Sequence, residues 1–150
     1  MATVNAYLTF NGNCEEAFLF YKSVFGGEFP YMGRFNEMPP SDDENQPKLS
    51  EVDGNKIMHV TLPISSETCL MGSDTGGEWS SQYKQGNNIS LSVNATSMDE
   101  ADRLFNGLSA GGQVTMPMNQ SFWGAYFGMF TDKFGINWMV NFDSNEQKNA

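Results

Sequence analysis

The chain contains one histidine, His59, and this residue is the clearest candidate for acid–base chemistry near neutral pH. It lies within residues 56–64, whose pattern predicts a strand. A general base needs a partner that orients it and a substrate proton within reach. A hydrogen-bonded structural histidine is the plainer interpretation. The sequence therefore offers His59 as a general base or a ligand contact and leaves the structural role open.

Two other side-chain types could also do chemistry. Arg34 carries a planar guanidinium that could hold a carboxylate or phosphate, although such an arginine is more often a solvated or interface charge. Cys14 and Cys69 lie far apart and form no CxxC motif, so we expect two reduced, partly buried thiols. A catalytic cysteine would need a nearby base, and His59 is the one imidazole available.

The composition predicts a globular protein and disfavours several kinds of partner. Hydrophobic residues make up 39% of the chain and charged residues 17%. The net charge of −10 and the scattered Lys and Arg argue against nucleic acid and against an anionic membrane surface. No apolar run approaches the ~20 residues of a membrane helix. Residues 1–5 lack the features of a signal peptide, so we expect a cytoplasmic protein.

An internal repeat organises the chain. Residues 6–11 align with residues 89–94, and both alternate as half-buried strands do. An acidic helix start follows each strand, at Cys14 and at Met98, with Asn13 and Ser97 as the expected N-caps. Both helices are expected to end at a glycine pair. Their apolar stripes are Ala17, Phe20, Tyr21 and Val24 in the first helix and Ala101, Leu104, Phe105 and Leu108 in the second.

Three further strands follow each helix, which predicts an α+β fold built from two βαβββ modules. The expected strands are 28–36, 56–64 and 68–73 in the first module and 113–122, 124–131 and 136–142 in the second. We expect one domain over 1–150, with module 1 at 3–74 and module 2 at 87–143. Residues 38–55 are expected to form a mobile loop that is either a lid or simply solvated, and residues 144–150 a frayed tail.

Four motifs carry a resemblance to a known family. They are FYKSVFGG at 20–27, KIMHV at 56–60, LMGSD at 70–74, and WG…TDKFG…WMVN at 123–141. In this order they resemble the PhnB-like branch of the glyoxalase/bleomycin-resistance/dioxygenase (vicinal oxygen chelate) superfamily. The resemblance implies a cupped mixed sheet with helices outside, a small-molecule ligand, often a divalent metal, and a homodimer. Some members carry a 3-demethylubiquinone 3-methyltransferase label, but no glycine-rich strand-to-helix loop for a nucleotide-like methyl donor is evident here.

The metal-ligand positions of the superfamily fall, by the repeat register, on Asn5, His59, Asn88 and Met139. Asparagine is a weak neutral donor, and a thioether suits soft metals. One imidazole does not make a zinc, nickel or iron site. We therefore expect no metal and no other cofactor, with a divalent metal as the open alternative.

Strand periodicity places polar residues together on one face. Asn5, Tyr7 and Thr9 share a face, and so do Asn88 and Ser90 farther along the chain. Such a face suits a neutral, hydrogen-bonding ligand. Aromatic residues near the last hairpin, Trp123 among them, could line the pocket or a dimer seam. The candidate ligand-binding set is Asn5, Tyr7, Arg34, His59, Asn88, Ser90, Trp123 and Met139, with His59 as the one candidate catalytic group.

Three functions are compatible with these residues. The first is a metal-independent small-molecule binding protein, or an enzyme of unknown substrate, on the glyoxalase-like scaffold. The second is a metal-dependent isomerase, lyase or dioxygenase that uses His59. The third is a drug-sequestering resistance protein, because an acidic chain attracts a cationic drug. Fold alone does not choose among them.

Overall fold

The computed structural model describes residues 2–39 and 49–143, which fall into two compact units, Met1–Lys84 and Gln85–Ala150. The first unit contains β1 (Ala6–Phe10), α1 (Cys14–Phe25), β2 (Tyr31–Arg34), β3 (Ile57–Pro63) and β4 (Cys69–Asp74). It also contains the short helices η1 (Phe35–Glu37), α2 (Glu51–Gly54) and η2 (Gly77–Gln82). The second unit contains β5 (Leu91–Asn94), α3 (Met98–Ser109), β6 (Gln113–Gln120), β7 (Ala125–Thr131) and β8 (Asn137–Asp143).

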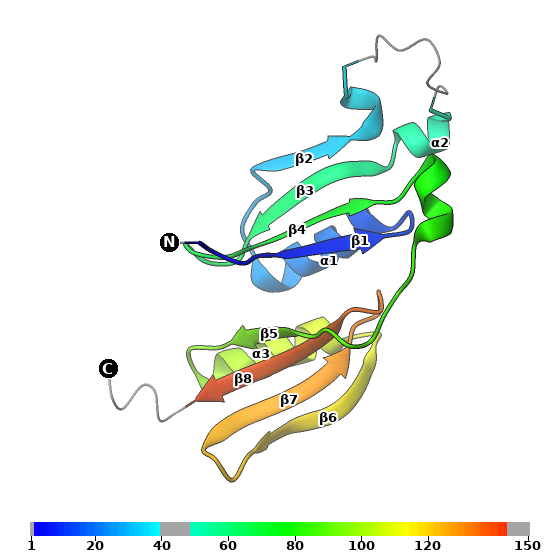
Figure 1. Cartoon of the computed structure of the whole chain (residues 1–150). Helices are drawn as coiled ribbons and strands as arrows, with labels where there is room; N and C mark the ends of the chain where they lie inside the picture. The colour runs from blue at the N-terminus through cyan, green and yellow to red at the C-terminus, as the bar shows by residue number, and fades with distance from the viewer. Residues whose placement is uncertain (1, 40–48, 144–150) are drawn as a thin grey trace. The chain divides into compact units, whose positions relative to one another are not determined.

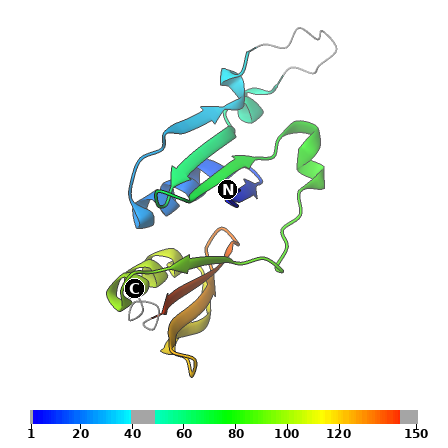
Figure 2. The same ribbon diagram turned by 60° about the vertical axis from the view of Figure 1, so that its left-hand side comes forward.

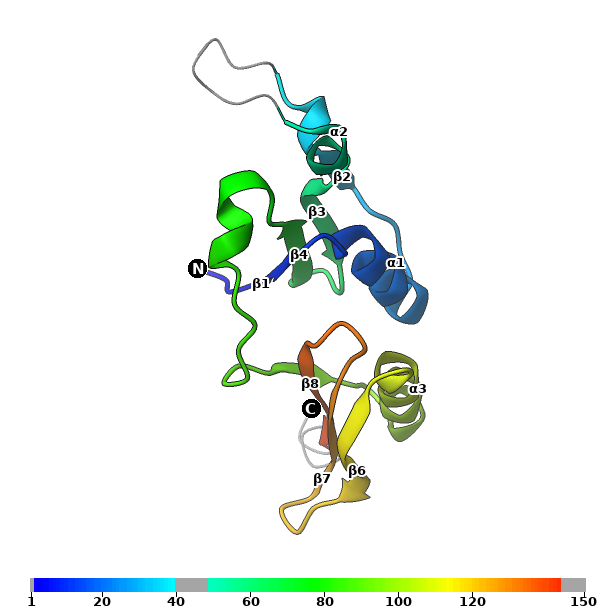
Figure 3. The same ribbon diagram turned by 90° about the vertical axis from the view of Figure 1, so that its right-hand side faces the viewer.

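Each unit is one mixed sheet with one long helix on one face (Figure 1, Figure 3). The strand orders are β1-β4-β3-β2 and β5-β8-β7-β6. In both, the first strand runs parallel to the last, and the other neighbours are antiparallel. Figure 2 shows the same βαβββ order in both units. The predicted α+β class and its two βαβββ modules are confirmed.

The core of the first unit lies between α1 and the sheet. Phe18 and Tyr21 are fully buried, and Phe18 packs edge-on against Phe10 of β1 with ring centroids 6.2 Å apart. Gly72 of β4 leaves room for this contact, because a Cβ there would lie 2.6 Å from the Phe18 ring and 2.8 Å from the Leu8 carbonyl oxygen. Phe20 and Val24 were predicted for this stripe, but both are half-buried and Phe18 takes their place.

The core of the second unit follows the predicted stripe of α3. Ala101, Leu104, Phe105 and Leu108 are all buried. Ser97 caps this helix as predicted, accepting a hydrogen bond from the Glu100 amide at 3.0 Å. Both helices are followed by a glycine with positive φ, Gly26 at +82° and Gly111 at +76°. These glycines allow the left-handed turn that ends a helix.

Other boundaries differ from the predictions. Asn13 occupies the N-cap position of α1 as predicted, but its side chain makes no capping hydrogen bond. The strand predicted at 28–36 is shorter, because β2 spans Tyr31–Arg34 and η1 follows it directly. Within the loop predicted at 38–55, residues Glu51–Gly54 form α2 and residues 40–48 lie outside the described residues, as does the tail 144–150. No helix in the described part of the chain is long and apolar enough to span a bilayer.

Candidate functional site

The face of the first sheet that α1 does not cover presents one row of side chains across all four strands. Tyr7 on β1 pairs with Met71 on β4, Met71 pairs with Thr61 on β3, and Thr61 pairs with Tyr31 on β2. Paired residues point to the same face of a sheet. The alternate residues on these strands, such as Phe10, Val60 and Leu70, are buried on the helix side. We call the uncovered side the open face of the first sheet.

His59 lies on this open face and is held through both ring nitrogens. Its Nδ1 lies 3.3 Å from the Tyr7 hydroxyl, and its Nε2 lies 3.0 Å from the Thr61 hydroxyl. A hydroxyl can donate or accept a hydrogen bond. Both partners can therefore adjust to either neutral tautomer of His59 or to the imidazolium.

Two tyrosine rings flank the imidazole. The ring centroids of Tyr7 and Tyr31 lie 5.7 Å and 5.9 Å from that of His59. Both tyrosines are 48% exposed, so part of each side chain remains open to solvent. Flat, half-exposed rings beside a hydrogen-bonding imidazole form a surface on which a planar molecule can stack.

Gly33 makes the position of Tyr31 possible. It pairs with His59 in the β2–β3 ladder. A Cβ at Gly33 would lie 2.3 Å from the Tyr31 hydroxyl oxygen and 2.8 Å from its Cζ atom, so the ring lies directly over this glycine. Glycine is thus the residue that lets Tyr31 lie flat against the sheet beside His59.

A bulge in β3 lies between its buried first residue and the residues that point to the open face. Gly33 pairs with His59 but Arg34 pairs with Ile57, so Met58 is the extra residue. Ile57 is fully buried, whereas His59, two residues later, stays half-exposed. The bulge therefore allows the start of β3 to join the core while His59 faces outward.

Asp74, the last residue of β4, is buried and holds the start of β3 in place. Its carboxylate accepts hydrogen bonds from the amides of Gly12 at 3.0 Å, Cys14 at 2.9 Å and Ile57 at 2.9 Å. The side chain is 5% exposed. One buried carboxylate thus ties the β1–α1 turn, the first residue of α1 and the start of β3 to the end of β4.

The two cysteines have different surroundings, which leads to a testable difference in reactivity. Burial raises the pKa of the Cys14 thiol, and the nearby carboxylates of Asp74 and Glu15 raise it further. Cys14 therefore stays protonated at pH 8, and the thiolate is the reactive form. We expect a thiol reagent to modify half-buried Cys69 first and Cys14 only after unfolding, as read by mass spectrometry. Equal labelling rates in the native protein would contradict this.

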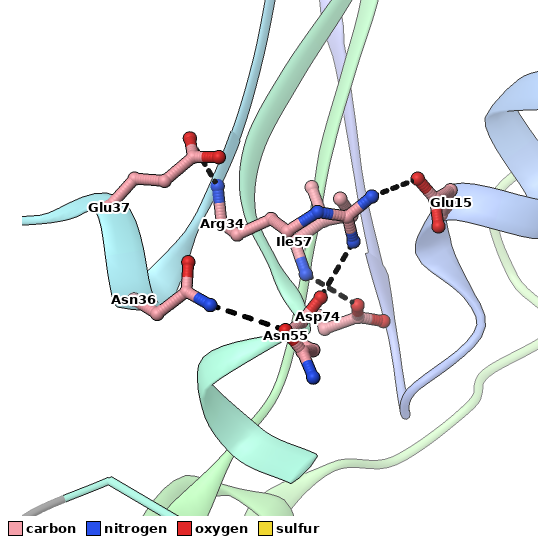
Figure 4. A network of polar contacts seen from close by, with 7 residues as sticks. All are labelled: Glu15, Arg34, Asn36, Glu37, Asn55, Ile57 and Asp74. Carbon is pink, nitrogen blue, oxygen red and sulfur yellow. Dashed lines mark hydrogen bonds and ion pairs between the residues drawn. The ribbon is translucent and has the colours of Figure 1, made fainter. Parts of the chain in front are cut away.

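Arg34 is part of a network of polar contacts with α1, η1 and the segment after α2 (Figure 4). Its guanidinium forms an ion pair with Glu15 of α1 and donates to the Asn55 backbone oxygen at 2.7 Å. The Asn36 amide also donates to the Asn55 side chain, at 3.2 Å. Arg34 therefore joins β2, α1 and the segment after α2, and the structure does not bring it together with His59.

The other predicted site residues of the first unit have distinct positions. Tyr7 contacts His59 as described. Asn5 instead uses its side-chain oxygen to accept a hydrogen bond from the Cys69 amide at 3.0 Å, which extends the β1–β4 pairing by one residue. Thr61, Tyr31 and Gly33 complete the surroundings of His59 and were not among the predicted residues.

The predicted residues of the second unit do not form one cluster. Asn88 and Ser90 are exposed and precede β5, which begins at Leu91. Met139 is half-buried on β8 and pairs with Ser92 of β5 and Met129 of β7. Trp123 is 59% exposed in the turn between β6 and β7.

A divalent metal does not fit the donors around His59 within the first unit. Both imidazole nitrogens already contact hydroxyls, and the Asn5 oxygen contacts a backbone amide. Among residues 2–39 and 49–143, no group of three or more His, Cys, Asp or Glu side chains could hold a metal ion. We therefore derive no chemical step through a metal.

Comparison with known families decides the classification. Residues 2–141 match the family described as 3-demethylubiquinone-9 3-methyltransferase. The chain belongs to this family. The predicted PhnB-like resemblance is thereby confirmed.

Three relatives within reach of sequence comparison agree with this assignment. Protein YjdN of Escherichia coli is 33% identical over 141 residues, covering 92% of this chain and 93% of YjdN. The crystal structure of PA1353 from Pseudomonas aeruginosa is 41% identical with a TM-score of 0.77, covering 95% of this chain and 98% of PA1353. A putative 3-demethylubiquinone-9 3-methyltransferase, PhnB protein, from Bacillus cereus is 25% identical with a TM-score of 0.70, covering 94% and 99%.

More distant proteins share the fold of this chain. A glyoxalase/bleomycin resistance protein/dioxygenase family enzyme from Burkholderia phytofirmans has a TM-score of 0.59 at 13% identity, covering 93% of this chain and 98% of that protein. This similarity shows that this chain has a glyoxalase-like fold and shows nothing about the reaction.

The methyl-transfer activity in the family's description can be tested against the first strand-to-helix connection. A nucleotide-like methyl donor is usually held by free amides in a glycine-rich loop at a helix N-terminus. Here the amides of Gly12 and Cys14 already donate to the Asp74 carboxylate, which is negatively charged. These two amides are therefore already engaged by a carboxylate of the chain itself.

Proposed function

We propose that the protein binds a small, planar, hydrogen-bonding molecule on the open face of the first sheet, without a metal. The single observation behind this proposal is the setting of His59. Its imidazole is hydrogen-bonded through both nitrogens to Tyr7 and Thr61 and lies between two half-exposed tyrosine rings. The ligand would stack on a ring and exchange a hydrogen bond with His59 or one of the hydroxyls.

The other residues of the open face support a ligand of low charge. They are Thr9, Cys69, Met71 and Ser73, together with the side chains of Tyr7, Tyr31 and Thr61 around the imidazole. None of these carries a carboxylate, an amine or a guanidinium. A strongly charged ligand group would therefore lose its hydration and find no fixed counter-charge among them, apart from the imidazolium form of His59.

A cationic aromatic ligand is the second candidate, and two observations favour it. Tyrosine ring faces attract cations, and the chain has a net charge of −10. Tight binding of such a compound without turnover would be drug sequestration. The experiment below separates the two kinds of ligand.

Nuclear magnetic resonance can test the site directly, because His59 is the one histidine in the chain and gives a single imidazole Hε1 signal. We would titrate the protein with phenol, benzoate and benzamidine, three probes of similar size that are neutral, anionic and cationic. We expect phenol to shift the His59 signal in a saturable way through its ring current. Stronger binding of benzamidine would favour the cationic ligand.

Matched variants complete the test. Tyr7→Ala should abolish the saturable shift, whereas Tyr83→Ala, which removes a tyrosine outside the four strands, should leave it unchanged. The proposal fails if none of the probes moves the His59 signal, or if both variants behave alike.

Metal dependence is tested separately by thermal unfolding of metal-stripped protein with Zn²⁺, Ni²⁺, Mn²⁺ or Fe²⁺. A metal at 100 times its dissociation constant would stabilise the fold by about 2.7 kcal/mol, or several degrees in Tm. We expect no such rise. A saturable rise that disappears in His59→Ala would instead favour the metal-dependent isomerase, lyase or dioxygenase.

A further inference from the structure

The face of the second sheet that points away from α3 carries three methionines in one row. Met116 on β6 pairs with Met129 on β7, and Met129 pairs with Met139 on β8. Paired residues point to the same face of a sheet. The opposite face belongs to the core, where Phe130 packs edge-on against Phe105 of α3 with ring centroids 5.2 Å apart (Figure 3). We call Met116, Met129 and Met139 the methionine row.

The thioether sulfurs of the methionine row can meet above the middle strand. Neighbouring strands lie about 4.8 Å apart, and an unbranched methionine side chain rotates freely about three bonds. Met116 and Met139 can therefore lean from either side toward Met129. The ladder between β6 and β7 is irregular on both sides of Met116, yet Met116 itself stays paired with Met129. Such irregularities often set the direction of a side chain next to a binding site.

The methionine row is accessible, which distinguishes it from core methionines. Met116 is 42% exposed, and Met129 and Met139 are half-buried. Met118, two residues farther along β6, has a different setting on the α3 side. Its sulfur lies 2.7 Å from the place where a Cβ on Gly128 would stand, so it fills the space that this glycine leaves. An ion from solution can thus reach the sulfurs of the row, whereas Met118 is a packing residue.

The polar side chains beside the methionine row are uncharged and contact each other. The Thr131 hydroxyl donates to the Asn137 side-chain oxygen at 2.7 Å. The Asn141 amide donates to the Asn94 side-chain oxygen at 3.5 Å. Hard cations such as Mg²⁺ and Ca²⁺ require several oxygen ligands, and carboxylates above all. Thioethers instead select soft ions such as Cu⁺. The donors on this face therefore favour a soft ion over a hard one.

We propose that the methionine row binds one soft monovalent metal ion, Cu⁺ or its analogue Ag⁺, through the three thioether sulfurs. The ligands are neutral, so the bound ion keeps its positive charge, and the net charge of −10 on the chain favours its approach. This site uses no imidazole and no carboxylate. It is independent of His59 and of the ligand proposed for the first sheet, and binding changes no oxidation state.

Ag⁺ is the first probe, because it does not undergo redox chemistry under these conditions. The full chain would carry ¹³C at the methionine methyl groups and be titrated with silver nitrate in chloride-free buffer. All proteins would carry Cys69→Ser, since the half-buried Cys69 thiol would compete for Ag⁺. We expect the methyl signals of Met116, Met129 and Met139 to shift together with one dissociation constant. Zn²⁺ should leave them in place.

Matched methionine-to-leucine variants assign the signals and test the site. Leucine conserves the volume of methionine, so the fold should persist, as circular dichroism would check. Met129→Leu removes the central sulfur and should weaken Ag⁺ binding at least about tenfold, because even the loss of an outer partner of a metal ligand costs about 10–100-fold. Met118→Leu is the control on the same sheet and should bind Ag⁺ like the parent protein.

Several outcomes would overturn the proposal. They are methyl signals that do not move with Ag⁺, signals that move with separate dissociation constants, an equal response to Zn²⁺, and equal weakening by Met118→Leu and Met129→Leu. An anaerobic titration with Cu⁺ should move the same three signals. Binding of Ag⁺ without binding of Cu⁺ would overturn the assignment to copper. Because His59 takes no part, the result for the methionine row does not depend on whether phenol binds the first sheet.

Discussion

Replacement of Asp74 by alanine is expected to lower the free energy of unfolding of the first unit by about 3–5 kcal/mol, or roughly 10 °C in Tm. The variant leaves the amides of Gly12, Cys14 and Ile57 without the acceptor they share. Each unsatisfied buried amide costs about 1–3 kcal/mol, and the three losses are not fully additive because they share one side chain. Thermal and urea unfolding would measure the change.

Glu16→Ala is the matched control for Asp74→Ala. It removes a carboxylate from the first turn of the same helix, but Glu16 is exposed, so we expect a loss within about 0.5 kcal/mol. Asp132→Ala offers a comparison in the second unit. There the carboxylate accepts from the amides of Phe134 and Ile136 and from the Trp138 indole. If Asp74→Ala and Glu16→Ala lost equal amounts of free energy of unfolding, the Asp74 carboxylate would not hold these three segments together.

The elements that local pattern controls were predictable from the sequence. Alternation on residues 6–10 predicted which side of β1 is buried, and the stripe on α3 predicted its four core residues. Ser97 and the glycines after both helices are short-range signals, and the structure confirms them. In each case the deciding interaction lies within a few residues along the chain.

The failures involve contacts between distant residues. Asn13 occupies the N-cap position of α1, but its side chain makes no capping hydrogen bond, and Asp74, 60 residues after Cys14, accepts a hydrogen bond from the Cys14 amide. Phe18 replaces Phe20 in the core because Gly72 on β4 leaves the space for its ring. Asp74 and Gly72 both lie on β4. Their contacts with α1 can be predicted only once the pairing of β1 with β4 is known.

In the candidate site, too, contacts that depend on distant residues could not be predicted from the local sequence pattern. His59 and Tyr7 were identified from residue type and strand periodicity, and the structure brings them together. Thr61 shares a face with His59 at the spacing of two residues, so periodicity on residues 56–64 could have identified it. Tyr31 and Gly33 were missed because their relation to His59 depends on the β2–β3 register. Arg34, chosen from the same strand, belongs instead to the ion pair with Glu15.

Gly33→Ala is expected to weaken ligand binding on the open face of the first sheet while leaving the fold intact. Its Cβ would occupy the space of the Tyr31 ring, 2.3 Å from the hydroxyl oxygen. Tyr31 is 48% exposed and can rotate away, so the stability loss should be small. His59 would then lose one of its two flanking rings. We expect its Hε1 signal to move downfield and phenol to bind about two- to tenfold more weakly, since one aromatic contact contributes about 0.5–1.5 kcal/mol.

A double-mutant cycle assigns this effect to Tyr31 rather than to the backbone. If Gly33→Ala acts by displacing the ring, Tyr31→Ala should weaken phenol binding equally, and the two changes together should add almost nothing further. Gly76→Ala is the control, because a Cβ there has no neighbour closer than 3.9 Å. Additive losses in the double variant would mean that Gly33 and Tyr31 act independently. Ligand binding on the open face would then depend on Tyr7 and His59, without a contribution from the Tyr31 ring.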